Sequence, residues 1–140
     1  MDWNNSLFEN KVRKIDLDES KIKTLQISAC KRKSFVDSHP ITDNNVSVLI
    51  TALYSSVEQM VYAVIASYGF EVSNKECIHY FLRDVLNNNF ISNSVKQYEK
   101  LSTEIIKNGK NLNAKEGLQM VKELKYVFEE LQKEVRYSRR

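Results

Sequence analysis

The sequence predicts an all-α protein, an antiparallel up-and-down helical bundle of about five helices. Glycine and proline are scarce, with three Gly and one Pro in 140 residues. That is too few for a sheet that needs many tight turns. Long segments carry apolar residues at helical spacing, and helix-capping residues separate these segments. The sequence contains no alternating strand pattern and no hairpin signal, so we expect helices throughout.

The most apolar segment, residues 45–69, predicts the central core helix. Fifteen of the 21 residues from Val46 to Ala66 are apolar, whereas an amphipathic surface helix needs about three to four per two turns. Polar residues at the middle of the segment argue against a membrane span. We expect Thr42 to cap this helix and Gly69 to end it in a left-handed conformation. A narrow polar stripe is left, formed by Thr51, Ser55, Glu58 and Gln59.

Two further helices are expected on either side of this segment. The first covers Glu19–Val36, with Asp18 as its cap, and the proline at position 40 prevents its continuation. The second begins at a capping box, Ser73 to Glu76, and ends at the asparagine run 87–89.

The last two helices form a pair at the C-terminal end. One covers Ser94–Lys107 and ends before Gly109, and the other begins at the capping pair Asn113 and Glu116. The second helix has a coiled-coil-like seam of about three heptads, which we expect to pack inside the bundle. The seam consists of Ala114, Gly117, Val121, Leu124, Phe128, Leu131 and Val135.

One domain, residues 15–137, is expected between a loosely held tail, residues 1–14, and a basic tail, residues 138–140. Trp3 and Phe8 are expected to dock on the domain's own surface or on a partner. The N-terminus shows no basic start followed by an apolar run, so no signal peptide is predicted and we expect a cytoplasmic protein.

The segment from Ala52 to Gly69, followed by Ser73–Leu82, resembles the HEPN superfamily. In that family a tyrosine-containing helix rich in small residues ends at a glycine, and a short helix follows it. A later helix pair completes an antiparallel bundle. The resemblance covers residues 46–131. It implies a bundle that is often a homodimer and, in many members, a metal-independent ribonuclease toxin paired with a nucleotidyltransferase antitoxin.

The family's ribonuclease signature is an Arg followed a few residues later by a His, and the resemblance places it between the last two helices. Here Lys107 stands at the Arg position, Asn108 at the polar position after it, and Leu112 at the His position. Leucine cannot transfer a proton, and lysine lacks the bidentate fork of arginine. The resemblance therefore implies a member without this nuclease centre. Lys107, Asn108 and Lys110 form either an anion-contacting loop or, more simply, a solvated connection.

Glu58 is a second candidate ligand contact, because it lies at the middle of the most apolar helix. A carboxylate there needs a partner or access to water. Pairing with Lys107 or Lys110 across the bundle would mark a ligand cleft. The polar stripe favours the other environments, a dimer surface or solvent.

Two basic segments are candidate nucleic-acid contacts, although a net charge of +3 does not by itself indicate nucleic-acid binding. The simpler interpretation of the first is a solvated helix end that complements the helix dipole. The candidate residues are Lys31, Arg32 and Lys33 in the first segment, and Arg136, Arg139 and Arg140 in the second.

No other catalytic or metal-binding pattern is present in the sequence. His39 and His79 are isolated from each other and from any nucleophile, and we expect His79 to be a hydrogen-bonded structural residue. The sequence has no glycine-rich phosphate loop, no metal motif and no serine elbow, so neither a cofactor nor a metal is expected.

The sequence thus favours a HEPN-like helical binding and assembly module, a homodimer without the family's nuclease motif. It would contact a nucleotide, RNA or a nucleotidyltransferase-type partner. One alternative is an active RNA-cleaving component of a toxin–antitoxin pair. Another is a structural subunit of a nucleic-acid complex, for which steep salt dependence of binding is the signature.

Overall fold

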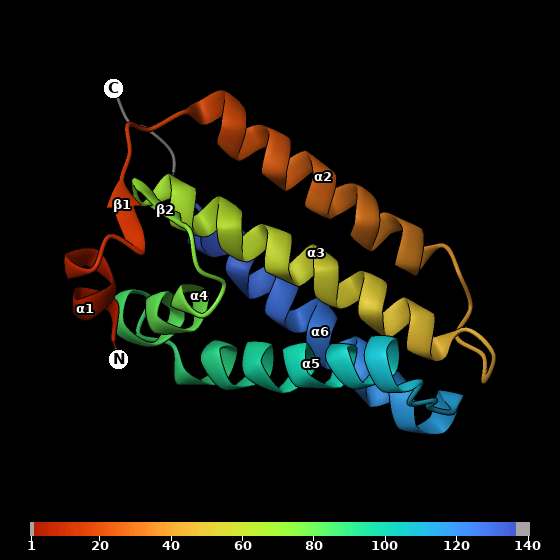
Figure 1. Ribbon diagram of the computed structural model, residues 1–140. Coiled ribbons are helices and arrows are strands. Elements are labelled where there is room, and N and C mark those ends of the chain that lie inside the picture. Colours follow the sequence, from red (N-terminus) through yellow and green to blue (C-terminus); the bar gives the residue numbers. More distant parts are fainter. Residues whose placement is uncertain (1, 137–140) are drawn as a thin grey trace.

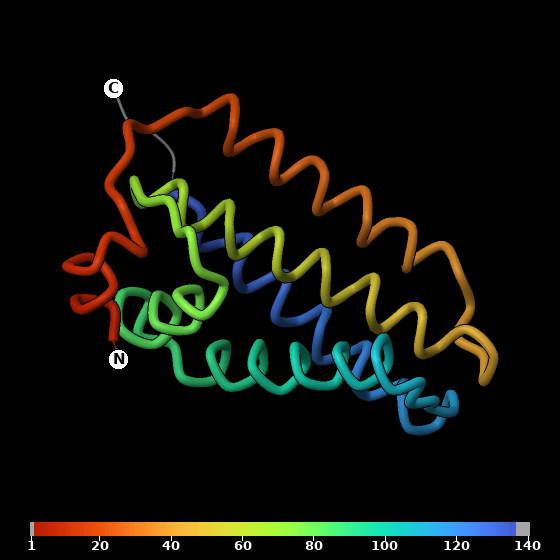
Figure 2. Tube along the Cα trace, viewed as in Figure 1, coloured from red at the N-terminus to blue at the C-terminus, as the bar shows by residue number. Residues whose placement is uncertain are grey.

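Helix α3 (Val46–Ser67) runs through the middle of the protein in the computed structural model, which describes residues 2–136. Three long helices pack on it: α2 (Glu19–Asp37), α5 (Asn89–Asn108) and α6 (Ala114–Glu134). In Figure 1, α2 and α5 lie on opposite sides of α3, and α6 lies behind it. Figure 2 shows that α2 and α3 run in opposite directions, as do α5 and α6. This arrangement confirms the predicted all-α bundle.

Helix α3 is the core helix that the sequence predicts. Among the described residues, it is the one helix long and apolar enough to cross a membrane by length and composition. Most of its apolar side chains are covered by the other helices, whereas Val48 is 62% exposed. Eight of them are completely buried: Val46, Ile50, Leu53, Val57, Met60, Val61, Ala63 and Val64.

Several predicted helix ends are confirmed by their hydrogen bonds. The Asp18 carboxylate accepts the backbone N–H of Lys21 at 3.1 Å, and α2 begins directly after it. Gly69 follows α3 with a φ of 85°, a conformation that favours glycine. Asn113 and Glu116 bond reciprocally to each other's backbone N–H at the start of α6, as a capping box requires.

Two predicted caps are wrong. Asn45, not Thr42, precedes α3, and these two side chains instead accept each other's backbone N–H groups. The capping box at Ser73 and Glu76 does not form. The Ser73 hydroxyl donates to the carbonyl of Lys11, a residue from the other end of the chain, and this tertiary bond replaces the local one.

The helices after α3 also differ from the predicted bounds. A short helix, α4 (Cys77–Tyr80), continues into a π-helical turn, η1 (Phe81–Val85). Helix α5 begins at Asn89 rather than Ser94, because the Asn88 side chain accepts the N–H of Ile91 at 3.0 Å and caps it. The asparagine run therefore contains the start of a helix as well as a break.

The N-terminal segment is folded onto the domain, in contrast to the predicted loosely held tail. It contains a short helix, α1 (Trp3–Phe8), and a strand, β1 (Val12–Lys14). That strand pairs antiparallel with β2 (Phe70–Val72), which follows α3. The two strands are far apart in the sequence, so no hairpin signal could have revealed this two-stranded sheet.

Trp3 attaches the N-terminal segment to the core. Its ring is 5% exposed and makes edge-to-face contacts with Phe70 and Phe81, at centroid distances of 5.2 and 5.4 Å. Its backbone N–H donates to the Asp84 carboxylate at 3.0 Å. Phe8, the other aromatic residue of the segment, is 89% exposed and does not dock.

Helix α6 packs its seam against α3, which confirms that the seam closes inside the bundle. Val121, Leu124, Phe128 and Leu131 are all buried. The two helices approach each other closely at Gly117, where an added Cβ atom would overlap Cγ2 of Val46. The close approach therefore requires glycine at this position.

We expect the substitution Gly117→Ala to destabilise the protein. Alanine normally favours a helix over glycine, but here the methyl group would overlap Val46, and overpacking typically costs about 1–3 kcal/mol. Urea unfolding measures the change. Gln119→Ala, at an exposed site on the same helix, is the control and should change the free energy of unfolding by less than about 0.5 kcal/mol. Equal stability of the two variants would contradict the close approach.

We expect Trp3→Ala to lower the free energy of unfolding by about 3 kcal/mol, since a large buried aromatic side chain is removed. Phe8→Ala provides the matched control, because this side chain lies in the same helix and is exposed. Its effect should stay within about 0.5 kcal/mol. If urea unfolding found no difference between the two variants, the N-terminal segment would not be part of the folded core.

Candidate functional site

A polar cleft opens between α3 and α5, at the end closed by the loop before α4. Its volume is about 180 Å³. It brings together two candidate residues from distant segments of the sequence, Glu58 and Lys107. The lining residues are Tyr54, Ser55 and Glu58 from α3, Lys75 from the loop, and Glu99, Ser102, Thr103, Ile106 and Lys107 from α5.

Two residues of the polar stripe of α3, Ser55 and Glu58, line this cleft. Ser55 and Glu58 are separated by about one helical turn, so they lie on the same side of α3. The pairing of Glu58 with Lys107 or Lys110, the less favoured of the alternatives that the sequence left open, is not present. Glu58 instead forms an ion pair of 3.0 Å with Lys75, and only 22% of its side chain is exposed. It therefore faces a cleft inside the monomer rather than open solvent.

Lys75 connects the two carboxylates of the cleft. Its ammonium lies 3.0 Å from Glu58 and 3.9 Å from Glu99. The hydrogen bond to Glu58 raises the pKa of Lys75, and this effect outweighs the opposing effect of burial. The ammonium is thus charged at neutral pH and holds the loop before α4 against both α3 and α5.

Tyr54 supplies a hydroxyl group at the cleft floor. This hydroxyl donates to Glu58 at 3.4 Å. Burial raises the pKa of Tyr54, and the nearby negative charge of Glu58 raises it further. Tyr54 therefore stays neutral and acts as a hydrogen-bond donor across the physiological range.

A second cavity, of about 450 Å³, lies beside the first and shares Lys75, Glu99 and Thr103 with it. It lies between α4 and α5. Glu76 and His79 line it from the α4 side, and Lys100 and Glu104 line it from α5. The two cavities therefore form one continuous polar region around Lys75.

His79 is the buried histidine of this region. Its Nε2 atom lies 3.0 Å from the Glu99 carboxylate, which confirms the predicted hydrogen-bonded histidine. Its Nδ1 atom is buried and has no hydrogen-bond partner. Glu99 thus contacts both His79 and Lys75, and it holds the imidazole in a fixed orientation.

The junction between α5 and α6 places its residues differently. Lys107 lines the cleft, while Asn108 ends α5 and is exposed. Lys110 is exposed, and its backbone N–H bonds to the carbonyl of Glu104. Leu112, which the HEPN resemblance aligns with a His, is buried, and its N–H donates to the Ser47 hydroxyl at 2.9 Å. This position is part of the core and faces no ligand.

The basic triplet does not form one patch. Successive residues of a helix point about 100° apart, so Lys31, Arg32 and Lys33 leave α2 in three directions. Lys33 forms an ion pair with Asp37 at 3.0 Å and lies over the Phe128 ring. Burial raises the pKa of Asp37, but hydrogen bonds from Lys125 and Lys33 outweigh it and the net shift is downward. Lys31 and Arg32 are exposed.

Arg136 lies at the opposite end of α3 from the α5–α6 junction. The guanidinium of Arg136 lies 3.6 Å from the ring centroid of Tyr68, and its backbone N–H donates to Ser67 at 2.9 Å. Arg139 and Arg140 fall outside the described residues. The structure therefore does not bring Arg136 together with Lys31 or Lys107.

Sequence reasoning missed Lys75, Glu99 and His79 as members of a site. In the sequence, Lys75 and Glu99 look like ordinary surface charges, and only the three-dimensional packing places them beside Glu58. Within the described part of the chain, no group of three or more His, Cys, Asp or Glu residues could hold a metal ion. Ion pairs and hydrogen bonds are the interactions this region offers to a ligand.

Comparison of the chain with protein-family models, with curated proteins and with solved structures finds no match.

We expect Lys75→Met to destabilise the protein in a pH-dependent way. A lysine whose pKa is raised by folding stabilises the folded state fully below its ordinary pKa, about 10.4, and loses this effect as pH rises through the folded value. Because Lys75 is partly exposed, the loss at neutral pH should be no more than about 1 kcal/mol.

Urea unfolding at neutral pH and above about pH 11 measures this effect, with Lys100→Met as the control lysine of the same region. The difference between wild type and Lys75→Met should shrink at high pH. A difference that stays constant with pH would show that the ion pair does not stabilise the fold.

Proposed function

We propose that this protein is a cytoplasmic HEPN-like binding module that holds a nucleotide or the end of an RNA chain in the α3–α5 cleft without cleaving it. The observation that carries the proposal is the convergence of Glu58 and Lys107 in one cleft. The adjoining cavity of about 450 Å³ lies within the range of about 300–1,000 Å³ that is typical of small-molecule sites.

The distribution of charge in this region supports a ligand that carries a phosphate at one end and hydrogen-bond donors at the other. Lys107 is exposed at one end of the cleft and has no ion-pair partner among the described residues, so its ammonium is available to a phosphate. The carboxylates of Glu58 and Glu99 can accept hydrogen bonds from ribose hydroxyls or base amino groups. A nucleotide offers both kinds of group.

The buried side chain of Leu112 supports binding without cleavage. The family's signature requires a proton-transfer group at this position, and here the position belongs to the core. The proposal therefore gives Lys107 a contact role in the cleft, and it gives no catalytic role to Lys107 or to the neighbouring Asn108 and Lys110.

One observation favours the alternative, an active RNA-cleaving toxin component. His79 and Glu99 form an imidazole–carboxylate pair at 3.0 Å beside the cleft, and such a pair can orient a histidine for proton transfer. No comparable observation favours a structural subunit of a nucleic-acid complex, because the predicted basic residues point in different directions or lie apart.

We further propose a homodimer, with a nucleotidyltransferase-type protein as the partner that the family resemblance implies. The α6 seam is already used inside the bundle, so self-association requires other apolar residues. Phe90 and Tyr126 are both half exposed and contact each other at 5.7 Å between centroids. They offer an apolar contact on the outer surface of α5 and α6. Light scattering of the purified protein tests the oligomeric state.

Calorimetric titration with AMP and with a short single-stranded oligoribonucleotide tests the cleft. We expect saturable binding that weakens about tenfold in Lys107→Ala, since a hydrogen bond to a charged group contributes about 1.5–3 kcal/mol. Glu58→Gln should weaken it as well. Lys122→Ala, an exposed lysine on α6 outside the cleft, is the control and should bind as wild type. Absence of binding, or equal loss in the control, would contradict the proposal.

A nuclease assay with the same labelled oligoribonucleotide, in the presence of a chelator, separates the two candidate functions. We expect the RNA to stay intact. Cleavage that disappears in His79→Asn, while the folded structure is retained by circular dichroism, would establish the RNA-cleaving alternative.

A further inference from the structure

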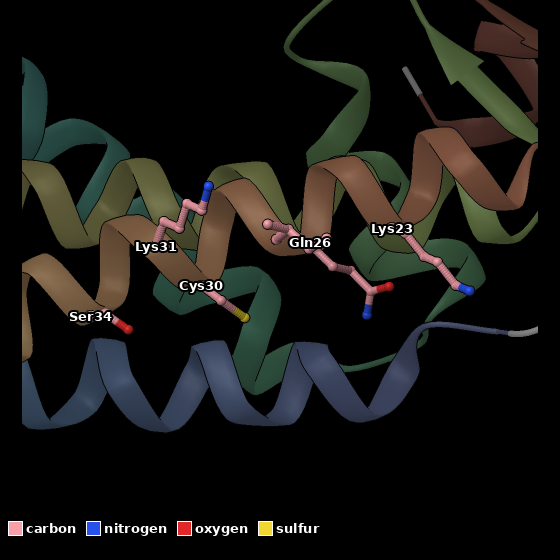
Figure 3. A pocket seen from close by; sticks show the side chains of 6 residues that line it. Lys23, Gln26, Cys30, Lys31 and Ser34 are labelled. Carbon is pink, nitrogen blue, oxygen red and sulfur yellow. The ribbon is translucent and has the colours of Figure 1, made fainter.

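A groove runs along the outer side of α2, next to α6 (Figure 3), with a volume of about 580 Å³. In this view the side chains of Cys30 and Ser34 are directed towards α6, and Lys31 lies on the other rim. The lining residues are Lys23, Gln26, Ile27, Cys30, Lys31 and Ser34.

Helices α2 and α6 both pack on α3, and they contact each other through the ends of their side chains. Helix α2 buries Ile22, Ala29 and Val36 in the core, so its outer side stays open. It reaches α6 through the ion pair of Asp37 with Lys125 at 2.8 Å and through Cys30, whose sulfur accepts a hydrogen bond from Gln132 at 3.5 Å. These two contacts lie on the side of α2 that faces α6, and all six residues that line the groove belong to α2.

Cationic and apolar residues alternate along the groove. Lys23, Ile27 and Lys31 line it at intervals of four residues, and Phe35 follows at the same interval outside the lining residues. Ile27 is 56% exposed and Phe35 is 54% exposed. Neither Lys23 nor Lys31 has an ion-pair partner among the described residues, in contrast to Lys33, which is paired with Asp37.

The spacing of the two lysines defines the surface that a partner must present. Lys23 and Lys31 lie eight residues apart, which corresponds to about 12 Å along the helix axis. The whole groove, from Lys23 to Ser34, extends over about 16 Å, or three helical turns. A complementary helix would carry two carboxylates about two turns apart and an apolar residue between them that packs on Ile27.

We infer that this groove binds an acidic amphipathic helix of a partner protein. The partner helix would lie along the outer side of α2, with its apolar side on Ile27 and its carboxylates paired with Lys23 and Lys31. This is the helix-in-groove mode of recognition. The groove is separate from the α3–α5 cleft, so the inference goes beyond ligand binding there and does not depend on it.

Charge favours this occupant over two others, a second copy of the chain and a nucleic acid. A second copy docked symmetrically would place α2 against α2 and bring the same lysines together, which is unfavourable. A nucleic-acid backbone would need a row of cations, but Arg32 and Lys33 point away from the groove, and its middle is occupied by the apolar Ile27.

The experiment uses a fluorescent synthetic helix of about five turns, with leucines along one side and two glutamates two turns apart. Fluorescence anisotropy should show saturable binding to the full-length protein. Binding should weaken about tenfold or more in the double variant Lys23→Glu/Lys31→Glu, and about tenfold in Ile27→Ala. A peptide with lysines in place of the two glutamates should bind the double variant and not wild type.

Arg32→Glu is the matched control, because it makes the same charge change on the same helix outside the groove, and it should bind the acidic peptide as wild type does. Amide chemical-shift changes should be confined to α2. Equal loss in Arg32→Glu, or no saturable binding, would overturn the inference. Competition by a single-stranded oligonucleotide would also overturn it, because the occupant would then be a nucleic acid. A dimer that dissociates in the double variant would overturn it as well, because the occupant would then be a second copy of the chain.

Discussion

The burial of α3 is the constraint on which the rest of the structure depends. Its apolar residues extend over more than half of the helix circumference, and three helices are needed to cover them. Burying each such side chain contributes about 1.5–3 kcal/mol, so α2, α5 and α6 are all held by contact with the same helix. The remaining polar stripe cannot be covered by an apolar face, and the α3–α5 cleft opens along it.

The ion pairs around Lys75 follow from this constraint. Glu58 belongs to the stripe and is only 22% exposed, so it needs a positively charged partner. Lys75 fills this role, and it also approaches Glu99, which in turn contacts His79. One partly buried carboxylate thus fixes the loop before α4 and brings the histidine to the edge of the cleft. The pairing that supports the fold is also the pairing that a ligand would meet.

The α3–α5 cleft and the groove beside α2 differ in chemistry because they arise in different ways. The α3–α5 cleft exposes the polar stripe of a core helix, and its acidic and basic groups balance one another. The groove beside α2 lies on the outer side of that helix. There the exposed Ile27 stands between Lys23 and Lys31, neither of which has an ion-pair partner among residues 2–136. The first surface suits a small polar ligand. The second suits an amphipathic protein segment.

The sequence by itself determined the helical class, the core helix, the α6 seam and the caps at Asp18, Gly69 and Asn113, because these depend on local periodicity and on hydrogen bonds between near neighbours. It also selected Glu58 and Lys107. Only the tertiary structure decided the β1–β2 pairing, the docking of Trp3 and the partners Lys75, Glu99 and His79. These contacts join residues that are distant in the chain. The sequence around a lysine or glutamate does not indicate which distant residue its side chain will contact.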